Sequence, residues 1–324
     1  MCVLLDRMWK FYQTRFIVPY KRGIFRKSDK CNLCPRECDV DRKNGQKGVC
    51  GVSGTRIVGA RAALHMWEEP CISGEVGSGA VFFSGCPLRC VYCQNYEIAQ
   101  ARHGVEITVE KLAEIFLELQ AKGAANINLV TPTHYTLEII EAVHIARKKG
   151  LKLPMVYNCS GYEKVETLRR LEGIVDVYLT DYKYEESGLA KKYSSAPDYP
   201  NAVKKALAEM VRQCGEAKFD DNGMMKKGVI VRNLLLPGNV ENSKAVVKYV
   251  YETYGDRVYL SLMNQYTPLP HVAKWPEINR KVTVEEYEEL VNYAIAIGVE
   301  NGFIQEGETA EESFIPAFDF EGWK

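Results

Sequence analysis

Residues 80–93 read AVFFSGCPLRCVYC, a short apolar run followed by a loop that carries three cysteines. The run 80–83 is continuous and is bounded by a Ser-Gly pair. This pattern indicates a buried β-strand that leads into the loop. The cysteines are separated by three and by two residues and stand at Cys86, Cys90 and Cys93. This strand and its loop decide how the rest of the chain is interpreted.

Three thiolates at this spacing predict an iron–sulfur cluster. Three cysteines can bind three irons of a [4Fe–4S] cluster and leave the fourth iron open, which inner-sphere chemistry requires. A structural zinc ion would need a fourth ligand, and the nearest histidine, His103, lies ten residues beyond Cys93. A disulfide would leave one thiol unpaired. We therefore expect a [4Fe–4S] cluster with an open iron on this loop.

Strand-like and helix-like stretches alternate downstream of the loop. Thr108 is the predicted cap of a helix at 109–122, and Thr283 with Glu286 forms a predicted capping box. Because each crossover helix returns the chain to the same edge, the strands should be mostly parallel. An open sheet, a full barrel and a partial barrel all fit this periodicity. Strands are predicted at 126–131, 153–158, 175–180, 227–236, 258–263 and 302–305, and further helices at 136–149, 162–171, 200–215, 240–254 and 283–297.

The cysteine spacing, with Tyr92 as the aromatic residue before the last cysteine, resembles the signature of the radical SAM superfamily. The resemblance covers residues 78–306 and implies an α/β fold, a partial (β/α)6 barrel of the radical SAM type. It implies that the open iron binds S-adenosylmethionine. The reduced cluster would then cleave this cofactor to a 5′-deoxyadenosyl radical that abstracts hydrogen from a substrate. Cys86, Cys90 and Cys93 would thus hold the cluster that initiates the radical.

Within the superfamily, the sequence resembles an uncharacterised branch related to pyruvate formate-lyase activating enzyme. Kinship of this kind implies an oxidoreductase that takes electrons from a donor such as flavodoxin or ferredoxin. It also implies a protein partner, a glycyl radical enzyme, on whose glycine the radical is installed. The alternative is modification of a small molecule or of an RNA. The resemblance is carried by CNLCPRECDVDRKNGQKGVCG, FFSGCPLRCVYCQNYEIA, NLVTPTHY, PMVYNCSGY, YLTDYKY, LLLPG and SLMNQYTP.

The loop after the second predicted strand departs from the family pattern. Many superfamily members carry Gly-Gly-Glu there, but residues 131–134 read TPTH. An ammonium group needs only acceptors, so we expect Thr131 and Thr133 to hold the amino group of S-adenosylmethionine, with Tyr92 also at the cofactor. His134 in this loop and Cys159 after the next strand stay undecided between a catalytic and a structural role.

Further polar residues end the next three predicted strands. Asn158 and Ser160 follow the third strand and are expected to contact the cofactor's carboxylate or ribose. Asp181 and Lys183 resemble the D-x-K found here in activating enzymes, and residues two apart in an extended segment face the same side. Arg232, on the fifth strand, is expected to reach the cofactor, because a buried arginine without a partner is too costly.

A second cysteine group precedes the loop, at Cys31, Cys34, Cys38 and Cys50. Four thiolates within twenty residues predict a metal-organised knuckle that needs little core of its own. Zinc and an iron–sulfur cluster both satisfy four sulfurs, so the metal stays open. We expect a Cys-rich extension at residues 1–75, followed by the barrel and a C-terminal cap at 76–324.

Composition narrows the setting in which the protein acts. Hydrophobic residues make up 46% and charged residues 26% of 324 residues, and the formal net charge is zero. A neutral chain argues against long-range attraction to nucleic acid, although basic residues gather in 1–30. No stretch approaches the roughly 18 apolar residues that would cross a bilayer, so we expect a cytoplasmic protein. A non-enzymatic electron carrier gains nothing from an open iron, and a zinc-organised binding module needs no β/α core.

Overall fold

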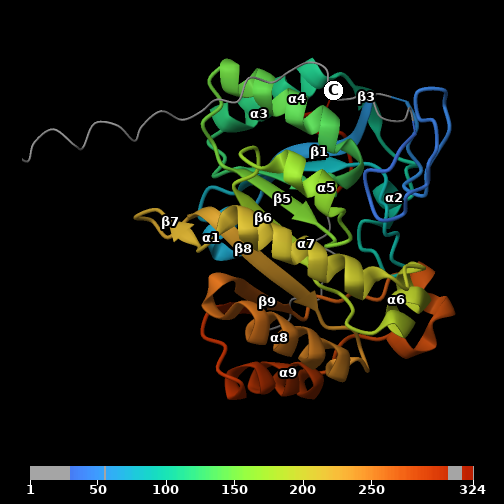
Figure 1. Ribbon diagram of the computed structural model, residues 1–324, viewed down its shortest axis with the longest axis vertical. Coiled ribbons are helices and arrows are strands. Elements are labelled where there is room, and N and C mark those ends of the chain that lie inside the picture. The colour runs from blue at the N-terminus through green and yellow to red at the C-terminus, as the bar shows by residue number, and fades with distance from the viewer. Residues whose placement is uncertain (1–29, 55, 306–315, 324) are drawn as a thin grey trace, which may run out of the picture.

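The computed structural model describes residues 30–54, 56–305 and 316–323, which build one curved sheet with helices on its outer side (Figure 1). Seven of its strands run parallel. Their ends do not close, because the strand order runs β10-β9-β8-β6-β5-β4-β2-β1-β3 as an open path. The parallel strands are β2 (Ser78–Phe83), β4 (Ile127–Val130), β5 (Met155–Cys159), β6 (Val177–Asp181), β8 (Met225–Leu234), β9 (Tyr259–Met263) and β10 (Gly302–Ile304).

Helices separate these strands and cover the outside of the sheet, so six β/α units form the expected partial (β/α)6 barrel. The apolar side of each helix packs on the sheet; in α3, for example, Leu112, Ile115 and Phe116 are buried. The outer helices are α3 (Val109–Ala121), α4 (Thr136–Lys148), α5 (Val165–Leu168), α7 (Tyr199–Cys214), α8 (Val240–Tyr254) and α9 (Val284–Ala296), with α6 (Ser187–Ser194) before α7. Short pieces are α1 (Pro70–Ser73), α2 (Tyr96–Ala99) and the 3-10 turns η1 (Thr133–Tyr135), η2 (Arg169–Leu171), η3 (Gly255–Arg257), η4 (Pro270–Lys274) and η5 (Pro276–Ile278).

Both predicted helix caps are confirmed. The Thr108 side chain accepts a hydrogen bond from the backbone of Lys111, and Thr283 and Glu286 form the reciprocal capping box. The helix expected at 162–171 is shorter than predicted. Gly161 has φ of 75°, and a Cβ at this position would lie 2.2 Å from the Asp181 carbonyl oxygen. This close approach keeps 161–164 as a loop and delays the helix to α5.

Two strands at one edge of the sheet were not predicted from the sequence. They pair antiparallel and so lie outside the alternation of parallel strands and helices. β1 (Ile57–His65) pairs with β2, and β3 (Val105–Ile107) pairs with β1. A further short strand, β7 (Lys218–Phe219), pairs with β8. β1 therefore belongs to the main sheet although it lies within the predicted extension 1–75, and the boundary between residues 75 and 76 stays a prediction.

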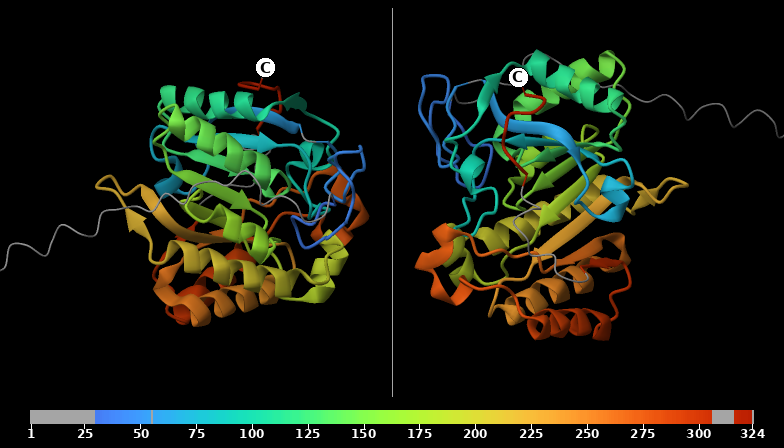
Figure 2. Two further views of the ribbon diagram at one scale, coloured as in Figure 1. Left: turned by 45° about the horizontal axis from the view of Figure 1, so that its top comes forward. Right: turned by 180° about the vertical axis from the view of Figure 1, so that it is seen from behind.

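The Cys-rich residues 30–54 lie beside α2 (Figure 1, blue) and form turns around an isolated bridge between Cys31 and Val40. At the other end of the chain, residues 316–323 cross β1 (Figure 2, right, red). Of the basic residues gathered in 1–30, all but Lys30 lie outside the described residues. Among the helices that the structure describes, none has the length and apolar character that a membrane span requires.

Candidate active site

The carboxyl ends of the parallel strands surround a pocket, the place where barrel enzymes position their chemistry. The parallel strands β2, β4, β5, β6, β8 and β9 each contribute a lining residue, respectively Phe82, Val130, Asn158, Asp181, Arg232 and Met263. The cysteine loop that follows β2 covers part of the pocket, and its three cysteines all line the cavity. The structure thus brings together the cysteines and the strand-end polar residues that the sequence singled out.

The three cysteines are free thiols held by the loop and by α6. The Ser194 hydroxyl donates to the Cys90 Sγ at 3.1 Å, and the Arg89 backbone N–H points to the Cys86 Sγ at 3.5 Å. Arg89 takes a φ of 55°, a left-handed backbone conformation that is uncommon for residues other than glycine. Burial raises the pKa of the Cys86 thiol to about 11. Metal binding at this thiol must therefore displace a proton.

The donor set of this loop suits a cluster. Across residues 30–54, 56–305 and 316–323, no group of three or more His, Cys, Asp or Glu side chains converges on one point as a single metal ion would require. A [4Fe–4S] cluster makes a different demand, because each iron takes its own thiolate. Three sulfurs around one cavity, with an open side toward the strand ends, meet that demand.

Asp181 and Lys183 form an ion pair at the rim of the pocket. The Lys183 Nζ lies 2.7 Å from an Asp181 carboxylate oxygen, and both side chains line the cavity. Burial acts to lower the pKa of Lys183, but the Asp181 carboxylate and the thiolate forms of Cys90 and Cys93 outweigh it and raise that pKa. Lys183 therefore stays positively charged beside the sulfur ligands.

The floor of the pocket is a buried charge cluster that the sequence did not predict. Arg232 donates through Nε to Glu69 at 2.8 Å and through Nη2 to both Glu68 and Glu69. The amides of Asn128 and Asn158 donate to Glu68 at 2.7 and 3.4 Å. Burial acts to raise the pKa of Glu69, but the Arg232 charge and hydrogen bonds hold it below its usual value.

The two threonines after β4 have different surroundings. Thr131 lines the pocket and has φ of 59°, a conformation that is strained for a β-branched residue and that is typical of functional sites. Thr133 does not line the pocket. Its hydroxyl is buried and donates to the Glu163 carboxyl at 2.6 Å, so its expected contact with the cofactor is not supported, because that hydroxyl is already committed.

Tyr199, another residue missed in the sequence, ties two strand ends together. Its hydroxyl donates to the Ser160 carbonyl at 2.8 Å and accepts the Lys183 backbone N–H at 2.9 Å. Ser160, Asn158 and Lys183 are thereby held around one cavity. Tyr92 lines the same cavity and accepts a hydrogen bond from the Tyr184 hydroxyl at 2.7 Å.

The structure separates the two undecided residues. His134 is buried away from the lining, with Nε2 at 2.8 Å from the Ser84 carbonyl oxygen, and burial lowers its pKa to about 3. A neutral His134 thus donates to Ser84 and supports the start of the cysteine loop. Cys159 lines the pocket, and its thiol donates to Thr180 Oγ1 at 3.4 Å.

Little in the sequence indicates the roles of Glu68, Glu69 and Tyr199. The buried Arg232 required an acidic partner, but many carboxylates lie upstream of it, and nothing local selects the pair that precedes Pro70. Tyr199 sits in the first turn of a helix, where its apolar neighbours indicate core packing.

Known protein families and proteins were compared with the sequence of this chain, and several are similar to it. A family model described as the Radical SAM superfamily matches residues 80–242. Two uncharacterised proteins of Methanocaldococcus jannaschii are similar over most of the chain. MJ0674 is 27% identical over 288 residues, which cover 86% of this chain and 77% of that protein. MJ0808 is 25% identical over 286 residues, which cover 79% of this chain and 78% of that protein.

Solved structures are similar at lower identity. Streptococcus suis SuiB bound to S-adenosylmethionine matches 68% of this chain at 14% identity with a TM-score of 0.46. The FeFe-hydrogenase maturase HydG from Carboxydothermus hydrogenoformans matches 71% at 12% identity with a TM-score of 0.45. The matches span 48% and 54% of those two chains, about half of each.

The family match covers half of the chain and includes the cysteine loop and the pocket-lining ends of β2, β4, β5, β6 and β8. The described fold is the partial barrel that the resemblance implied. The chain therefore belongs to the radical SAM superfamily, and its cofactors are a [4Fe–4S] cluster and S-adenosylmethionine.

Proposed function

We propose that Cys86, Cys90 and Cys93 hold the [4Fe–4S] cluster of this radical SAM enzyme and that the pocket beside them binds S-adenosylmethionine. The observation that carries this proposal is the cavity that the three free thiols share with Asn158 and Lys183. When bound, the two cofactors supply a 5′-deoxyadenosyl radical that takes a hydrogen atom from the substrate.

Different pocket residues would bind the two charged groups of the cofactor's methionyl end, one ammonium and one carboxylate. Lys183 would attract the carboxylate and Asp181 the ammonium, since both charges already face the cavity as a pair. Thr131 adds an acceptor in place of the missing glutamate. Ser160 and the amide of Asn158 add polar contacts at the end of β5.

Arg232 has a different role from the one expected. Its guanidinium is committed to Glu68 and Glu69, so it would form a fixed floor under the cofactor rather than a free arm. The carboxylates and the guanidinium already pair and form hydrogen bonds with each other. Binding of the cofactor over them would therefore add little to the free energy of desolvating these charges.

We assign the substrate to a protein partner, in which a glycine would lose hydrogen. The resemblance to activating enzymes favours this class. So does the pocket mouth, where the Trp67 side chain lines the cavity and is 59% exposed. An exposed aromatic at the rim of a site is typical of surfaces that bind other proteins. The zero net charge favours a protein over an RNA.

The donor of the electron would be a flavodoxin or a ferredoxin in a reducing cytoplasm. The ten described cysteines are free thiols, which suits such a compartment.

Anaerobic purification tests the cofactor assignment. The brown protein should yield 5′-deoxyadenosine, measured by mass spectrometry, when it is given S-adenosylmethionine and dithionite. Cys90→Ala should abolish this product, because it removes one of the three thiolates that would hold the cluster. Cys214→Ala, which changes a buried cysteine outside the pocket, should retain it. Full turnover by Cys90→Ala, or a colourless protein that holds zinc alone, would contradict the assignment.

The substrate class needs its own test. A glycyl radical enzyme encoded beside this gene should develop the electron paramagnetic resonance doublet of a glycyl radical when both proteins, S-adenosylmethionine and reductant are combined. Formation of 5′-deoxyadenosine that depends on a small metabolite or an RNA instead would show that the protein partner is wrong.

A further inference from the structure

The Cys-rich segment 30–54 folds into tight turns that carry its four cysteines. The backbone N–H of Cys31 donates to Val40 at 2.8 Å, and the N–H of Asp39 donates back to Cys31 at 3.1 Å. Glu37 and Asp39, on either side of Cys38, take φ of 39° and 53°. These turns fold residues 31–40 tightly, and a positive φ is uncommon for residues other than glycine.

The sulfur of Cys38 accepts a hydrogen bond from the backbone N–H of Val49 at 3.3 Å. A Cβ on Gly48 would lie 3.3 Å from the same sulfur, so the backbone of 48–49 approaches it closely. Backbone N–H groups that point at cysteine sulfur are the contacts that tune iron–sulfur clusters. Cys50 follows directly and is buried, whereas Cys31, Cys34 and Cys38 are partly exposed.

The spacing favours iron over zinc. Structural zinc sites usually pair their cysteines two and two, with two to four residues inside each pair. Here three cysteines fall within eight residues and the fourth stands eleven residues further on. Three grouped cysteines with a distant fourth is a spacing that iron–sulfur proteins use.

The segment is fastened to the first cysteine loop by Arg36, which lies between Cys34 and Cys38. Arg36 donates to the carbonyl oxygens of Pro87 at 2.9 Å, Leu88 at 3.3 Å and Ser194 at 2.7 Å. Ser194 is the residue whose hydroxyl contacts the Cys90 sulfur. The Arg36 guanidinium thus connects the two sets of cysteines, directly through the backbone of the loop 86–93 and indirectly through Ser194.

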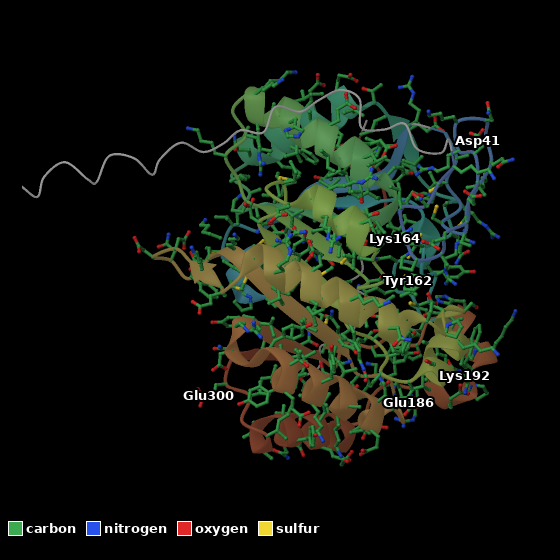
Figure 3. The ribbon with its side chains drawn as sticks, in the orientation of Figure 1. Asp41, Tyr162, Lys164, Glu186, Lys192 and Glu300 are labelled. Atoms are coloured by element: carbon green, nitrogen blue, oxygen red, sulfur yellow. The ribbon has the colours of Figure 1, made fainter. Side chains whose placement is uncertain are left out.

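Three further contacts hold the segment in place. Lys164 pairs with Glu37, and Thr167 donates to the Leu33 carbonyl at 2.8 Å. Figure 3 labels Lys164 and Tyr162 on the part of the barrel that lies toward this segment, which carries Asp41. Arg36 also stacks over Tyr162, with its guanidinium carbon 5.3 Å from the ring centre.

Cys50 lies next to the start of the first loop. A Cβ on Gly85, the residue before Cys86, would be 2.8 Å from the Cys50 carbonyl oxygen. From standard backbone lengths, the Cα atoms of Cys50 and Cys86 are therefore within about 11 Å of each other. Metal centres held by these two cysteines would be close neighbours.

We propose that Cys31, Cys34, Cys38 and Cys50 hold a second [4Fe–4S] cluster, which passes single electrons to the cluster of Cys86, Cys90 and Cys93. Four thiolates leave no iron open, so this cluster cannot bind S-adenosylmethionine or substrate directly and is suited to outer-sphere electron transfer. A flavodoxin- or ferredoxin-type donor loses one electron, the second cluster gains and then loses it, and the first cluster is reduced by one electron. The role as a relay rests on the proposed function of the first cluster.

The variant C86A/C90A/C93A tests the second cluster alone. After anaerobic purification it should retain about four irons and four sulfides per chain. On reduction with dithionite it should show the electron paramagnetic resonance signal of a reduced [4Fe–4S] cluster. Addition of S-adenosylmethionine should leave that signal unchanged, because no iron is open. A colourless variant with one zinc, or a signal that S-adenosylmethionine shifts, would overturn the proposal.

The relay is tested by the rate at which the first cluster is reduced. In Cys34→Ala, reduction by a flavodoxin should slow by an order of magnitude, whereas reduction by dithionite, which is small enough to reach the first cluster directly, should not change. Cys214→Ala is the matched control and should behave as the wild type with both reductants. Equal rates in Cys34→Ala with the protein donor would overturn the relay.

The two proposals fail in different ways. If the wild type forms no 5′-deoxyadenosine but C86A/C90A/C93A keeps a cluster that S-adenosylmethionine does not affect, the second cluster stands and the proposed function is wrong. If the wild type turns over but this variant holds no iron, the second cluster is wrong and the proposed function stands.

Discussion

At the scale of single residues, the protonation state of Glu163 links the stability of the fold to pH. Its carboxyl is buried, with the Thr133 hydroxyl at 2.6 Å and the Tyr157 hydroxyl at 3.3 Å. Burial raises the pKa of Glu163 to about 8, and these hydrogen bonds offset it only in part. At neutral pH the folded protein therefore holds a proton that the unfolded chain, whose glutamate pKa is about 4.3, has lost.

This linkage predicts how stability depends on pH. Because the folded state binds the extra proton, stability is full below the unfolded pKa and is lost as pH rises through the folded pKa. Between pH 5 and pH 8 the free energy of unfolding of the wild type should fall relative to Glu163→Gln, which cannot titrate, by up to about 1.4 kcal/mol per pH unit. Urea unfolding at several pH values measures this difference.

The comparison with Glu163→Gln makes the pH prediction specific. Glutamine preserves the shape of the side chain, and its oxygen and NH2 group stand in for the oxygen and O–H of a protonated carboxyl. Because glutamine does not titrate, the unfolding free energy of Glu163→Gln reports every other titrating group. If the difference between the two proteins is the same at pH 5 and at pH 8, Glu163 is ionised in the folded state and the buried network is held differently.

At the scale of elements, the short helix α1 closes the barrel under the pocket. Ile72 and Cys71 pack against Val156 of β5 and Ile230 of β8. These strand positions lie two residues before the pocket residues Asn158 and Arg232, and residues two apart in a strand share a face. α1 therefore fills the barrel at the amino ends of the strands, as its place in Figure 1 shows, and Glu69 immediately before it binds Arg232, which lines the pocket.

Truncation of the Ile72 side chain in α1 should destabilise the fold. Ile72 is fully buried, so Ile72→Ala loses transfer energy and leaves a cavity, a cost of about 2–5 kcal/mol. The matched control is Ile295→Ala in α9, where the side chain is 65% exposed and the change should stay within about 0.5 kcal/mol. Urea unfolding compares the two variants, and equal losses would show that α1 does not pack into the barrel.

At the scale of the whole molecule, the C-terminal residues fasten the edge of the sheet. The Ala62 backbone N–H donates to Glu321 at 2.8 Å, and the Phe320 N–H donates to Ala60 at 2.9 Å. Trp323 is 1% exposed, and its indole N–H donates to the Val105 carbonyl at 2.7 Å. The last described turn of the chain thus joins β1 to β3, and Pro316 before it lines the pocket.

The packing of Trp323 depends on a glycine in β1. A Cβ on Gly59 would lie 2.1 Å from the indole, so Gly59→Ala should cost about 1–3 kcal/mol through overpacking. Trp323→Leu should cost about 3 kcal/mol through the cavity that it leaves. The double variant should lose less than the sum, because the smaller side chain leaves room for the methyl group. Thermal or urea unfolding of all three variants gives the coupling.

A control separates this contact from a general effect of alanine. Gly188 in α6 has open space around its Cβ position and an ordinary φ. Gly188→Ala should therefore be neutral or stabilise the protein by about 0.4–1 kcal/mol. Additive losses in the Gly59 and Trp323 double variant would mean that the two residues do not share the contact.

The sequence by itself determined the elements that depend on near neighbours. The strand at 80–83, the spacing of Cys86, Cys90 and Cys93, and the caps at Thr108 and Thr283 follow from residues a few positions apart. Alternation of strands and helices then required parallel pairing. Because strand ends meet at one edge of such a sheet, the pocket residues Asn158 and Asp181 were predictable without coordinates.

Only the tertiary structure decided which distant residues meet. Arg232 and its acidic partners are more than 160 positions apart, and Arg36 reaches Ser194 across a similar separation. β1 joins the sheet antiparallel, and Thr133 turns to Glu163 rather than to the pocket. The physical reason is that periodicity and spacing report local backbone preference. Which buried charge finds its partner, and which hydroxyl is already occupied, depend on the packing of the whole chain.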